Sequence, residues 1–415
     1  MRGTVAIVGL GRIGLPLALS FADHGLHVVG VEKQQRMIDL IQAGKMPFEE
    51  TGTQELLERV LPTGRLSITS SIREAAAADW IVLTLGTPTF SHIELDISDI
   101  RGVVDDLMPL LRPEQTLILR STVGPGTTEW LAGYIEQRRG FVVGTEFFVA
   151  HVPERIAVNH FLEEIESLPA IIGGIDPHSG DRAAELFAVF GTEIMQTPPV
   201  QAELAKTWTN ILRYVEFAIP NLLMMNAEQH GANAFEVIDL INHDYPRGGM
   251  KRPGLTAGTC LRKDFAFSEE RSNAPGMLLA VSRVHESMPL FMVEGLKRRL
   301  GGSLRDCKVA VLGLTFKRDT DDLRDSLSEK LIRLLERELA HVARHDPFAA
   351  SEPIEDAVRD AQAIIVATNH SAYDNLLERL PLPQDALIVD PWNATGSGEV
   401  FSRARVPVEA WPESS

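Results

Sequence analysis

The sequence predicts an α/β protein in which two parallel-sheet domains are joined by a helical central domain with a long helix. Short apolar runs alternate with amphipathic helical stretches towards both ends of the chain, which is typical of parallel sheets covered by helices. The middle of the chain instead has an almost continuous helical pattern. A chain of 415 residues is too long for one hydrophobic core and suggests two or three domains. From this pattern of elements we expect three, at residues 1–199, 200–302 and 303–415.

The first domain is expected to begin with a strand, a helix and a second strand. An apolar run at residues 4–9 predicts the first strand, and the helical periodicity of residues 13–23 predicts the helix after it. Further strands are predicted at residues 27–31, 80–85, 116–119 and 141–150. This order of elements predicts a parallel sheet with helical crossovers.

The centre of the chain is predicted to be helical, and its last third returns to alternation. Residues 201–231 have the pattern of a long helix, which Pro220 should interrupt and kink because proline has no amide hydrogen to donate. More helix is predicted at residues 232–241 and 275–300. Strands at residues 308–312, 363–368 and 386–390, with a helix at 326–339, predict the second, smaller α/β domain.

The composition excludes several classes of protein. A formal net charge of −17 argues against a nucleic-acid binder, and it requires that any anionic substrate be met by a local cluster of cations. No stretch of 18 uncharged apolar residues occurs, so we expect no membrane-spanning helix. Two cysteines give no disulfide framework, which is typical of the reducing cytoplasm. We therefore expect a cytoplasmic protein that acts on a small molecule.

The clearest local motif follows the first predicted strand. Gly9, Gly11 and Gly14 form a GxGxxG pattern, which permits a tight turn, a close approach of pyrophosphate, and close helix packing. Glu32 ends the second strand, where an acid would take a ribose 2′-hydroxyl and repel a 2′-phosphate. These features predict a Rossmann-like domain that binds NAD rather than NADP, although Arg36 nearby is a cation that would suit NADP. A tight turn beside an ordinary surface glutamate is the alternative.

A second candidate site lies in the helical middle of the chain. Glu203, Lys206 and Asn210 are spaced by three and four residues and share one face of a helix. A cation and an amide on one face can hold a developing oxyanion or orient a water molecule. The alternative is a solvated face with a Glu-Lys pair.

Cys260 lies in the segment PGLTAGTCLRKD, which spans residues 253–264. A lone cysteine is most often a small apolar filler. The other interpretation is a nucleophile, since cations such as Arg262 and Lys263 favour the reactive thiolate. Cys307 begins an apolar strand, and we expect it to be a small apolar filler.

Several segments in the same order resemble the UDP-glucose/GDP-mannose dehydrogenase family of nucleotide-sugar dehydrogenases. After the glycine loop and Glu32 these are TLGTPT with Thr87 and Pro88, RSTVGPGTT with Thr122, VPERIAVN with Glu154, ELAKTWTN with Lys206 and Asn210, PGLTAGTCLRKD with Cys260, and VAVLGLTFKRDTDDLRDS with Lys317 and Arg324. The resemblance implies an NAD-binding first domain, a central domain for dimerisation and catalysis, and a third domain that binds the sugar nucleotide.

The resemblance implies oxidation of the C6 primary alcohol of a UDP-hexose or UDP-N-acetylhexosamine to the uronic acid. NAD would take four electrons in all, through a thiohemiacetal and a thioester on Cys260, because a thiol can attack the aldehyde, support the second hydride step and leave again. The catalytic residues implied are Cys260, Lys206, Asn210, Asp264, Glu154 and Thr122. Lys206 would stabilise each oxyanion, and Asp264 would position water for general-base work.

The resemblance also implies two sets of binding residues. The cofactor set is Gly9, Gly11, Ile13, Gly14, Glu32, Arg36, Thr87, Thr122, Lys263 and Arg324. The substrate set is Glu154, Lys206, Asn210, Arg247, Gly258 and Lys317. Lys317 would meet the phosphates of the substrate, no metal is implied, and two subunits would pair through the central helix as a homodimer.

Two other functions are compatible with parts of the pattern. A two-electron NAD-dependent hydroxy-acid or hydroxyacyl dehydrogenase would share the first domain, but it would need neither Cys260 nor the second α/β domain. A non-catalytic binding protein would have no reason to keep six catalytic residues together. Leu255, Ala257 and Arg262 depart from the family pattern around Cys260, which leaves the sugar open and keeps GDP and TDP as alternatives to UDP.

Overall fold

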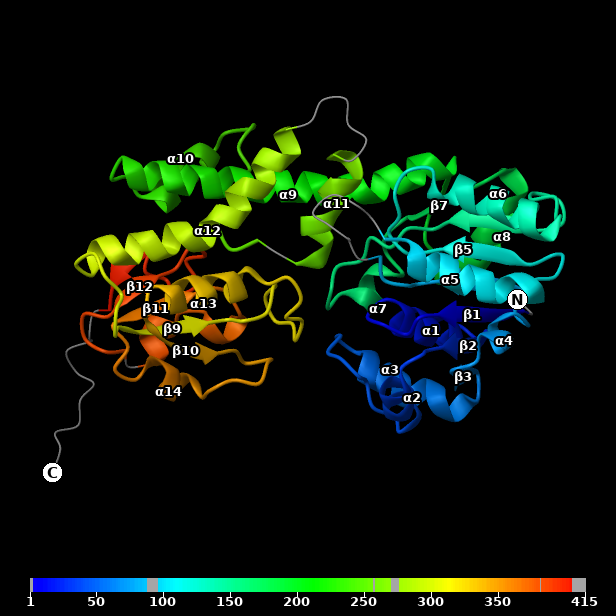
Figure 1. Ribbon diagram of the computed structural model, residues 1–415, viewed down its shortest axis with the longest axis horizontal. Coiled ribbons are helices and arrows are strands. Elements are labelled where there is room, and N and C mark those ends of the chain that lie inside the picture. Colours follow the sequence, from blue (N-terminus) through cyan, green and yellow to red (C-terminus); the bar gives the residue numbers. More distant parts are fainter. Residues whose placement is uncertain (1–2, 88–95, 257, 270–275, 381, 405–415) are drawn as a thin grey trace. The chain divides into compact units, whose positions relative to one another are not determined.

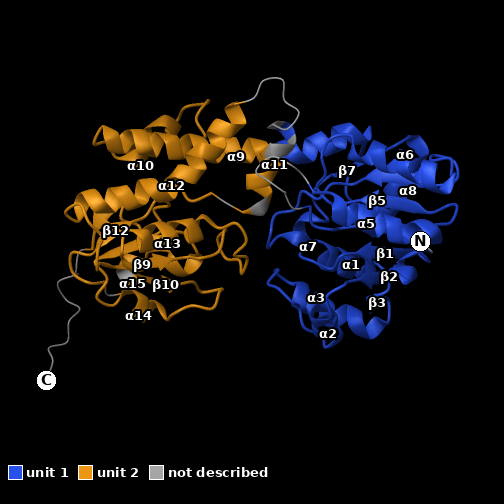
Figure 2. Cartoon of the chain, viewed as in Figure 1, with its two compact units in different colours: residues 1–209, 266–270 blue, residues 210–265, 271–415 orange. Residues whose placement is uncertain are grey.

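The computed structural model describes residues 3–87, 96–256, 258–269, 276–380 and 382–404. The chain forms two compact units, Met1–Thr209 with Ala266–Glu270 and Asn210–Phe265 with Arg271–Ser415, which Figure 2 draws in blue and orange. The first unit contains an eight-stranded sheet and the second a five-stranded sheet. The predicted α/β class with two largely parallel sheets and a long helix is confirmed.

The strands of the first unit follow the predicted alternation with helices. They are β1 (Thr4–Val8), β2 (His27–Val31), β3 (Leu66–Thr69), β4 (Trp80–Leu83), β5 (Thr116–Leu119), β6 (Phe148–His151), β7 (Ala170–Gly174) and β8 (Ile194–Thr197). Their order is β3-β2-β1-β4-β5-β6-β7-β8, with only the β6–β7 pair antiparallel. The strand order changes direction between β1 and β4, and the crevice at the carboxyl ends of such strands is where α/β proteins bind ligands.

Both faces of this sheet are buried, which explains why its strands are apolar at successive positions. Val5 and Ile7 of β1 pack into one hydrophobic cluster, and Ala6 and Val8 pack into a second. Side chains alternate between the two faces of a strand, so the clusters lie on opposite sides of the sheet. A parallel sheet needs such cover on both faces.

Helices and short 3-10 turns connect these strands. They are α1 (Gly14–Asp23), α2 (Gln35–Gln42), α3 (Thr53–Val60), η1 (Leu61–Thr63), α4 (Ile72–Ala75), α5 (Ser98–Leu107), η2 (Met108–Leu110), α6 (Thr127–Arg139), α7 (Phe161–Glu164), α8 (Pro177–Phe187) and η3 (Ala188–Phe190). The helix predicted at residues 13–23 is α1, with Ile13 as its N-cap residue.

Two sequence predictions in this unit need correction. The strand predicted at residues 141–150 is reduced to β6, because Gly144 adopts a left-handed conformation (φ +89°) that interrupts an extended chain before it. The sequence analysis also missed β3, β7 and β8. The strands β3 and β8 are sheet edges of four residues with partly exposed side chains, so their apolar pattern is weak.

The long predicted helix is α9 (Pro199–Gln229), which is green in Figure 1. It runs through Pro220 as one helix, so the predicted interruption does not break it. It is followed by α10 (Ala234–Asn242), α11 (Thr259–Glu269) and α12 (Met277–Arg299). Within the described ranges, no helix has both the length and the apolar character needed to cross a lipid bilayer.

The second unit repeats the parallel-sheet plan on a smaller scale. Its strands are β9 (Lys308–Leu312), β10 (His341–His345), β11 (Ala363–Val366), β12 (Leu387–Val389) and β13 (Phe401–Arg403), in the order β10-β9-β11-β12-β13. The pairs are parallel except β12–β13. The remaining helical segments are α13 (Leu327–Arg337), α14 (Ile354–Val358), η4 (Ser371–Tyr373) and α15 (Leu376–Arg379). The sequence analysis missed β10 and β13.

The core of the second unit joins its sheet to α12. Val309 and Val311 of β9 share a buried cluster with Met292 and Leu296 of α12. Ala310, on the opposite face of β9, packs into a separate cluster. The five-stranded sheet is therefore buried on both faces like the larger one.

Candidate active site

The glycine loop after β1 has the geometry that a dinucleotide requires. Gly9 has φ +98°, and its N–H donates to the carbonyl of Val31 at 2.9 Å, which joins the loop to the end of β2. A Cβ on Gly14 would lie 1.8 Å from the carbonyl oxygen of Gly9, so only glycine allows α1 to approach so closely. A Cβ on Gly11 would meet no atom within 4 Å. The backbone at Gly11 is thus open to a phosphate, as the motif predicts.

Glu32 lies beside this loop and is not the ordinary surface glutamate of the alternative interpretation. Its side chain is buried, with Oε2 accepting from the N–H of Leu10 and Oε1 from the N–H of Gln34, both at 3.0 Å. A carboxylate has lone pairs for further donors, so it can also accept from a ribose hydroxyl. Arg36, in the first turn of α2, is exposed. The residues present therefore fit NAD.

The structure brings two of the predicted cofactor segments together. The Thr87 hydroxyl donates to the carbonyl of Thr122 at 2.8 Å, which ties the loop after β4 to the loop after β5. Thr87 is buried and Thr122 is half-buried. Pro88, which was predicted to share this loop, lies outside the described residues.

Glu154 has a buried partner that sequence reasoning did not assign. Arg120 donates to Glu154 Oε2 at 2.5 Å, and its other contacts are the carbonyls of Val152 and Pro153. The guanidinium also lies 5.1 Å from the centre of the Phe187 ring. The second oxygen of Glu154 accepts from its own loop, so the carboxylate is held from two sides. The available sequence signal for this partner was Arg120 itself, which stands directly before Ser121 and Thr122.

The face of α9 that carries Glu203, Lys206 and Asn210 is buried, so the solvated-pair alternative is wrong. Glu203 accepts from the N–H of Gly126 at 2.7 Å, and from the N–H and hydroxyl of Thr128 at 2.8 and 2.6 Å. Burial raises the pKa of Glu203, and the hydrogen bonds from Thr128 and Gly126 oppose the rise. Glu203 therefore holds the N-terminus of α6, and does not pair with Lys206 in solvent.

Lys206 is buried in the first unit, and its charge affects the pKa of His151. Burial, together with the charges of Arg120 and Lys206, lowers the pKa of His151 to about 3. His151 ends β6 and is fully buried. His151 is therefore neutral at physiological pH, and the buried cations beside it are Arg120 and Lys206.

The second unit brings together three of the predicted catalytic residues. Asn210 of α9 donates to Asp264 Oδ2 of α11 at 2.6 Å, and both side chains are buried. Cys260 is exposed and lies one helical turn before Asp264 on α11. The cysteine segment thus ends in a helix, and the positive end of the helix dipole favours the thiolate of Cys260.

The turn before Cys260 is packed tightly. Gly258 has φ +96°, its N–H donates to the carbonyl of Asp325 at 3.3 Å, and a Cβ on it would lie 2.5 Å from the ring of Phe316. Leu255 of the same segment is buried, whereas Ala257 lies outside the described residues. Gly258 is therefore needed for both conformation and close approach.

The cations around Cys260 differ in how far their charge is engaged. Arg262 pairs with Glu286 at 2.8 Å and with Asp325 at 3.6 Å, so much of its charge is neutralised. The hydrogen bonds that Arg324 donates to Asp322 raise the pKa of Arg324 most, and the charge of Cys260 adds to the rise. Arg324 also pairs with Asp322, at 2.7 Å, so its charge is partly neutralised as well.

The other predicted cations occupy separate positions. Lys263 is half-buried on α11, and Lys317 is half-buried in the loop after β9. Arg247 is exposed, and its Nε donates to the Tyr245 hydroxyl at 2.9 Å. The predicted site residues numbered up to Lys206 belong to the first unit. Those from Asn210 onwards belong to the second.

Comparison with known proteins finds similarity along most of the chain. Models of the UDP-glucose/GDP-mannose dehydrogenase family match the chain with their NAD binding domain at residues 3–191, their central domain at 200–287 and their UDP binding domain at 310–397. The UDP-N-acetyl-D-mannosamine dehydrogenase of Pyrococcus horikoshii is 30% identical over 381 residues, which cover 90% of each chain. The NDP-N-acetyl-D-galactosaminuronic acid dehydrogenase of Ralstonia solanacearum is 27% identical over 416 residues, which cover 94% of this chain and 96% of that protein.

Solved structures give the same result. A structure of UDP-D-ManNAc dehydrogenase from Pyrococcus horikoshii superposes with a TM-score of 0.85 and 30% identity, over 89% of this chain and 90% of that one. The predicted resemblance and NAD as the cofactor are confirmed. The chain therefore belongs to the UDP-glucose/GDP-mannose dehydrogenase family and is an NAD-dependent nucleotide-sugar dehydrogenase.

Proposed function

We propose that the protein oxidises C6 of a UDP-N-acetylhexosamine, with UDP-N-acetyl-D-mannosamine as the first candidate, to the uronic acid in two steps. Support for the sugar comes from relatives named for UDP-N-acetyl-D-mannosamine and NDP-N-acetyl-D-galactosaminuronic acid. We assign NAD binding to residues 1–199, dimerisation and the catalytic segment to 200–302, and sugar-nucleotide binding to 303–415. The two-cysteine composition supports a cytoplasmic setting.

The observation that carries the four-electron reaction is the arrangement on α11. An exposed cysteine at the start of a helix stands one turn before a buried carboxylate that Asn210 holds at 2.6 Å. A two-electron hydroxy-acid dehydrogenase has no use for such a thiol. Cys260 is therefore assigned as the nucleophile that captures the aldehyde.

The chemistry balances with water as the only further reactant. One R–CH₂OH, two NAD⁺ and one water give R–COO⁻, two NADH and three protons. NAD supplies the hydride acceptor in both oxidations. The thiolate of Cys260 forms a C–S bond to the aldehyde carbon, that bond persists in the thioester, and it breaks when water attacks the thioester carbonyl.

The neighbouring residues are assigned by charge and burial. Lys206, a buried cation, would stabilise the oxyanion of each addition, and Asn210 would assist it. Asp264, with Thr122, would take a proton from water, and Glu154 would assist hydrolysis of the thioester. Glu154 is held by Arg120 and is ready to orient water without rearranging.

The long helix supports a homodimer. Leu204, Trp208, Leu212, Ile219 and Leu222 are exposed large apolar residues on α9 at spacings of four, four, seven and three. Those spacings place them along one face of the helix. A second copy of the same helix is the occupant we assign to this stripe, since a twofold pair would bury both copies of the stripe at once.

The test is the number of NADH molecules formed per sugar. Limiting UDP-N-acetyl-D-mannosamine with excess NAD is expected to give two NADH and the free acid. Cys260→Ser is expected to abolish formation of the acid, and mass spectrometry should then detect an ester on the introduced serine or released aldehyde. Cys307→Ser, at the half-buried start of β9, is the matched control and should turn over normally.

Two results would overturn this proposal. One NADH per sugar with aldehyde as the final product would identify a two-electron enzyme. If the Cys260→Ser variant turns over at the wild-type rate and forms no adduct, Cys260 is a small apolar filler and not the nucleophile.

A further inference from the structure

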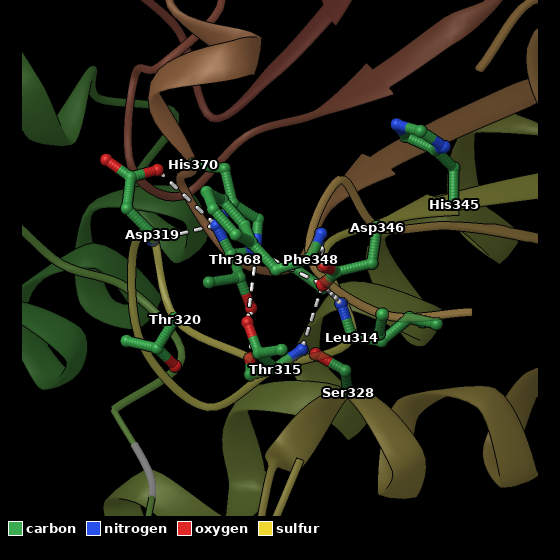
Figure 3. A network of polar contacts seen from close by, with 12 residues as sticks. Leu314, Thr315, Asp319, Thr320, Ser328, His345, Asp346, Phe348, Thr368 and His370 are labelled. Carbon is green, nitrogen blue, oxygen red and sulfur yellow. Dashed lines mark hydrogen bonds and ion pairs between the residues drawn. The ribbon is translucent and has the colours of Figure 1, made fainter. Parts of the chain in front are cut away.

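A buried polar network lies at the carboxyl edge of the five-stranded sheet, where the loops after β9, β10 and β11 meet (Figure 3). β9 has β10 on one side and β11 on the other, so the strand order changes direction here. This is the position at which open α/β sheets bind ligands. The network joins Asp346 and His370, which the proposed function does not use, to the loop that contains Lys317.

Asp346 holds the first end of the loop. Its Oδ2 accepts from the N–H of Leu314 at 2.6 Å and of Thr315 at 3.0 Å, and its Oδ1 accepts from the N–H of Phe348 at 2.8 Å. Burial works to raise the pKa of Asp346, but the hydrogen bonds from His370, Leu314 and Phe348 outweigh it and lower the pKa to about 2. Asp346 is therefore a carboxylate at every pH where the enzyme would work.

His370 holds the other end of the loop and is fully buried. Its Nδ1 accepts from the N–H of Asp319 at 2.9 Å. An acceptor at Nδ1 requires the proton of a neutral imidazole to be on Nε2. Nε2 lies 3.1 Å from Asp346 Oδ2 and 3.0 Å from Thr315 Oγ1, so it donates to this pair. One neutral histidine thus joins the two ends of the loop.

The rest of the loop backbone is held within the domain as well. The N–H of Gly313 donates to His345, and that of Phe316 donates to Asp322. Arg318 donates to the carbonyl of Asn369 at 2.8 Å and pairs with Asp374 at 3.0 Å. The loop is therefore fixed to the domain on both sides of Lys317, at Phe316 and at Arg318.

We propose that Asp346 and His370 are positioning residues that hold residues 314–319 so that Lys317 meets the diphosphate of the nucleotide sugar. This inference rests on the proposed function for the role of Lys317. A flexible lysine loses side-chain and backbone entropy when it binds a phosphate, and a loop fixed at both ends has already lost the backbone part. Both side chains are buried, so each acts through Lys317.

The direct measurement is the affinity of the full-length protein for UDP by calorimetry, which needs no turnover. His370→Leu removes the hydrogen bonds of the imidazole to Asp319, Asp346 and Thr315 and is expected to weaken UDP binding about tenfold. It should raise KM for the sugar nucleotide similarly and leave KM for NAD unchanged, since the glycine loop and Glu32 lie outside the network. His341→Leu, a 72% exposed histidine on β10, is the matched control and should bind UDP like the wild type.

Two amide variants separate the ends of the loop. His370→Asn places an acceptor near the position of Nδ1 and keeps the bond to Asp319. His370→Gln places a donor near the position of Nε2 and keeps the bond to Asp346. Each is expected to weaken UDP binding less than His370→Leu. They keep the inference testable if the leucine variant does not fold, which thermal unfolding will reveal.

The decisive comparison is a double-mutant cycle with Lys317→Met. If His370 acts by placing Lys317, the double variant will bind UDP no more weakly than Lys317→Met alone. Additive losses, or His370 variants with wild-type UDP affinity, would overturn the inference and leave the proposed oxidation untouched. A wild type that binds UDP but oxidises no nucleotide sugar would instead overturn the proposed function, while the same cycle still decides the positioning role. If the wild-type protein does not bind UDP, both the positioning inference and the proposed function are overturned.

Discussion

Glu32 shows how one buried carboxylate can serve both the fold and cofactor choice. It accepts hydrogen bonds from two backbone N–H groups, one of them in the glycine loop. Those bonds fix the position of the carboxylate at the end of β2, where the sequence predicts contact with the ribose of NAD. A charge held this way in a low-dielectric setting strongly disfavours a second anion nearby.

The prediction at this scale is a preference for NAD that depends on Glu32. The wild type should have a higher kcat/KM with NAD than with NADP, and Glu32→Ser should reduce the ratio about tenfold or more. Steady-state rates with both cofactors will measure it. Glu55→Ser, which removes an exposed carboxylate of α3, should leave the ratio unchanged. A wild-type preference for NADP would mean that Arg36 binds the 2′-phosphate.

At the scale of elements, Glu203 joins the helix α9 to the start of α6. The first N–H groups of a helix have no partner within it, and here a carboxylate from a distant helix accepts from two of them. The same contact fixes the segment after Thr122 against the helix that contains Lys206. The position of the proposed catalytic groups in the first unit therefore depends on it.

We expect Glu203→Gln to destabilise the first unit. The amide nitrogen of glutamine cannot accept a hydrogen bond, so one buried N–H group loses its partner, at a cost of about 1–3 kcal/mol. A lower midpoint of urea unfolding, followed by tryptophan fluorescence, would demonstrate the loss. Glu129→Gln changes an exposed carboxylate in the first turn of the same helix and should shift the midpoint much less. Equal midpoints for both variants would contradict the role of Glu203.

At the scale of the whole molecule, two buried histidines make the fold sensitive to acid. Burial lowers the pKa of His285 to about 4 and that of His151 to about 3. Above pH 6.5 they are neutral in the folded and the unfolded chain and do not affect stability. As the pH falls below 6.5 the unfolded chain binds protons first, so stability is lost until the folded pKa is reached.

His285 provides the test of this acid sensitivity. Each such histidine contributes a slope of up to about 1.4 kcal/mol per pH unit below pH 6.5. His285→Gln should therefore flatten the fall in unfolding midpoint between pH 6.5 and about 4. Thermal unfolding at several pH values will measure the slope, and His341→Gln should leave it as in the wild type. An unchanged slope in the His285 variant would refute the assignment.

Assembly is the second prediction at this scale. Leu212→Glu and Leu222→Glu place charges on side chains of α9 that are 59% and 56% exposed in the single chain. If the stripe pairs with its copy, each substitution buries two like charges at the interface and should give particles of half the wild-type mass in sedimentation. Leu240→Glu, on α10 and 76% exposed, is the control and should keep the wild-type mass. A monomeric wild type would exclude the homodimer.

Much of the fold was predictable because its signals are local. The strands at β1, β2, β5 and β9 were predicted with at most one residue of error, since a buried parallel strand is a continuous apolar run. The glycine loop was predictable because its glycines are needed for local backbone reasons, such as the positive φ of Gly9 and the close approach at Gly14. Edge strands such as β3 and β8 were missed, because four half-exposed residues contain too little apolar pattern to stand out.

The sequence by itself determined the α/β class, most of the buried strands and the cofactor loop, and it singled out Cys260 as a candidate nucleophile, because each of these depends on a short segment. Only the tertiary structure decided which partners the polar side chains have. Asn210 meets Asp264 across 54 positions, and Arg120 meets Glu154 across 34. Such contacts depend on how helices and strands pack, and no spacing along the chain encodes a hydrogen bond between residues so far apart.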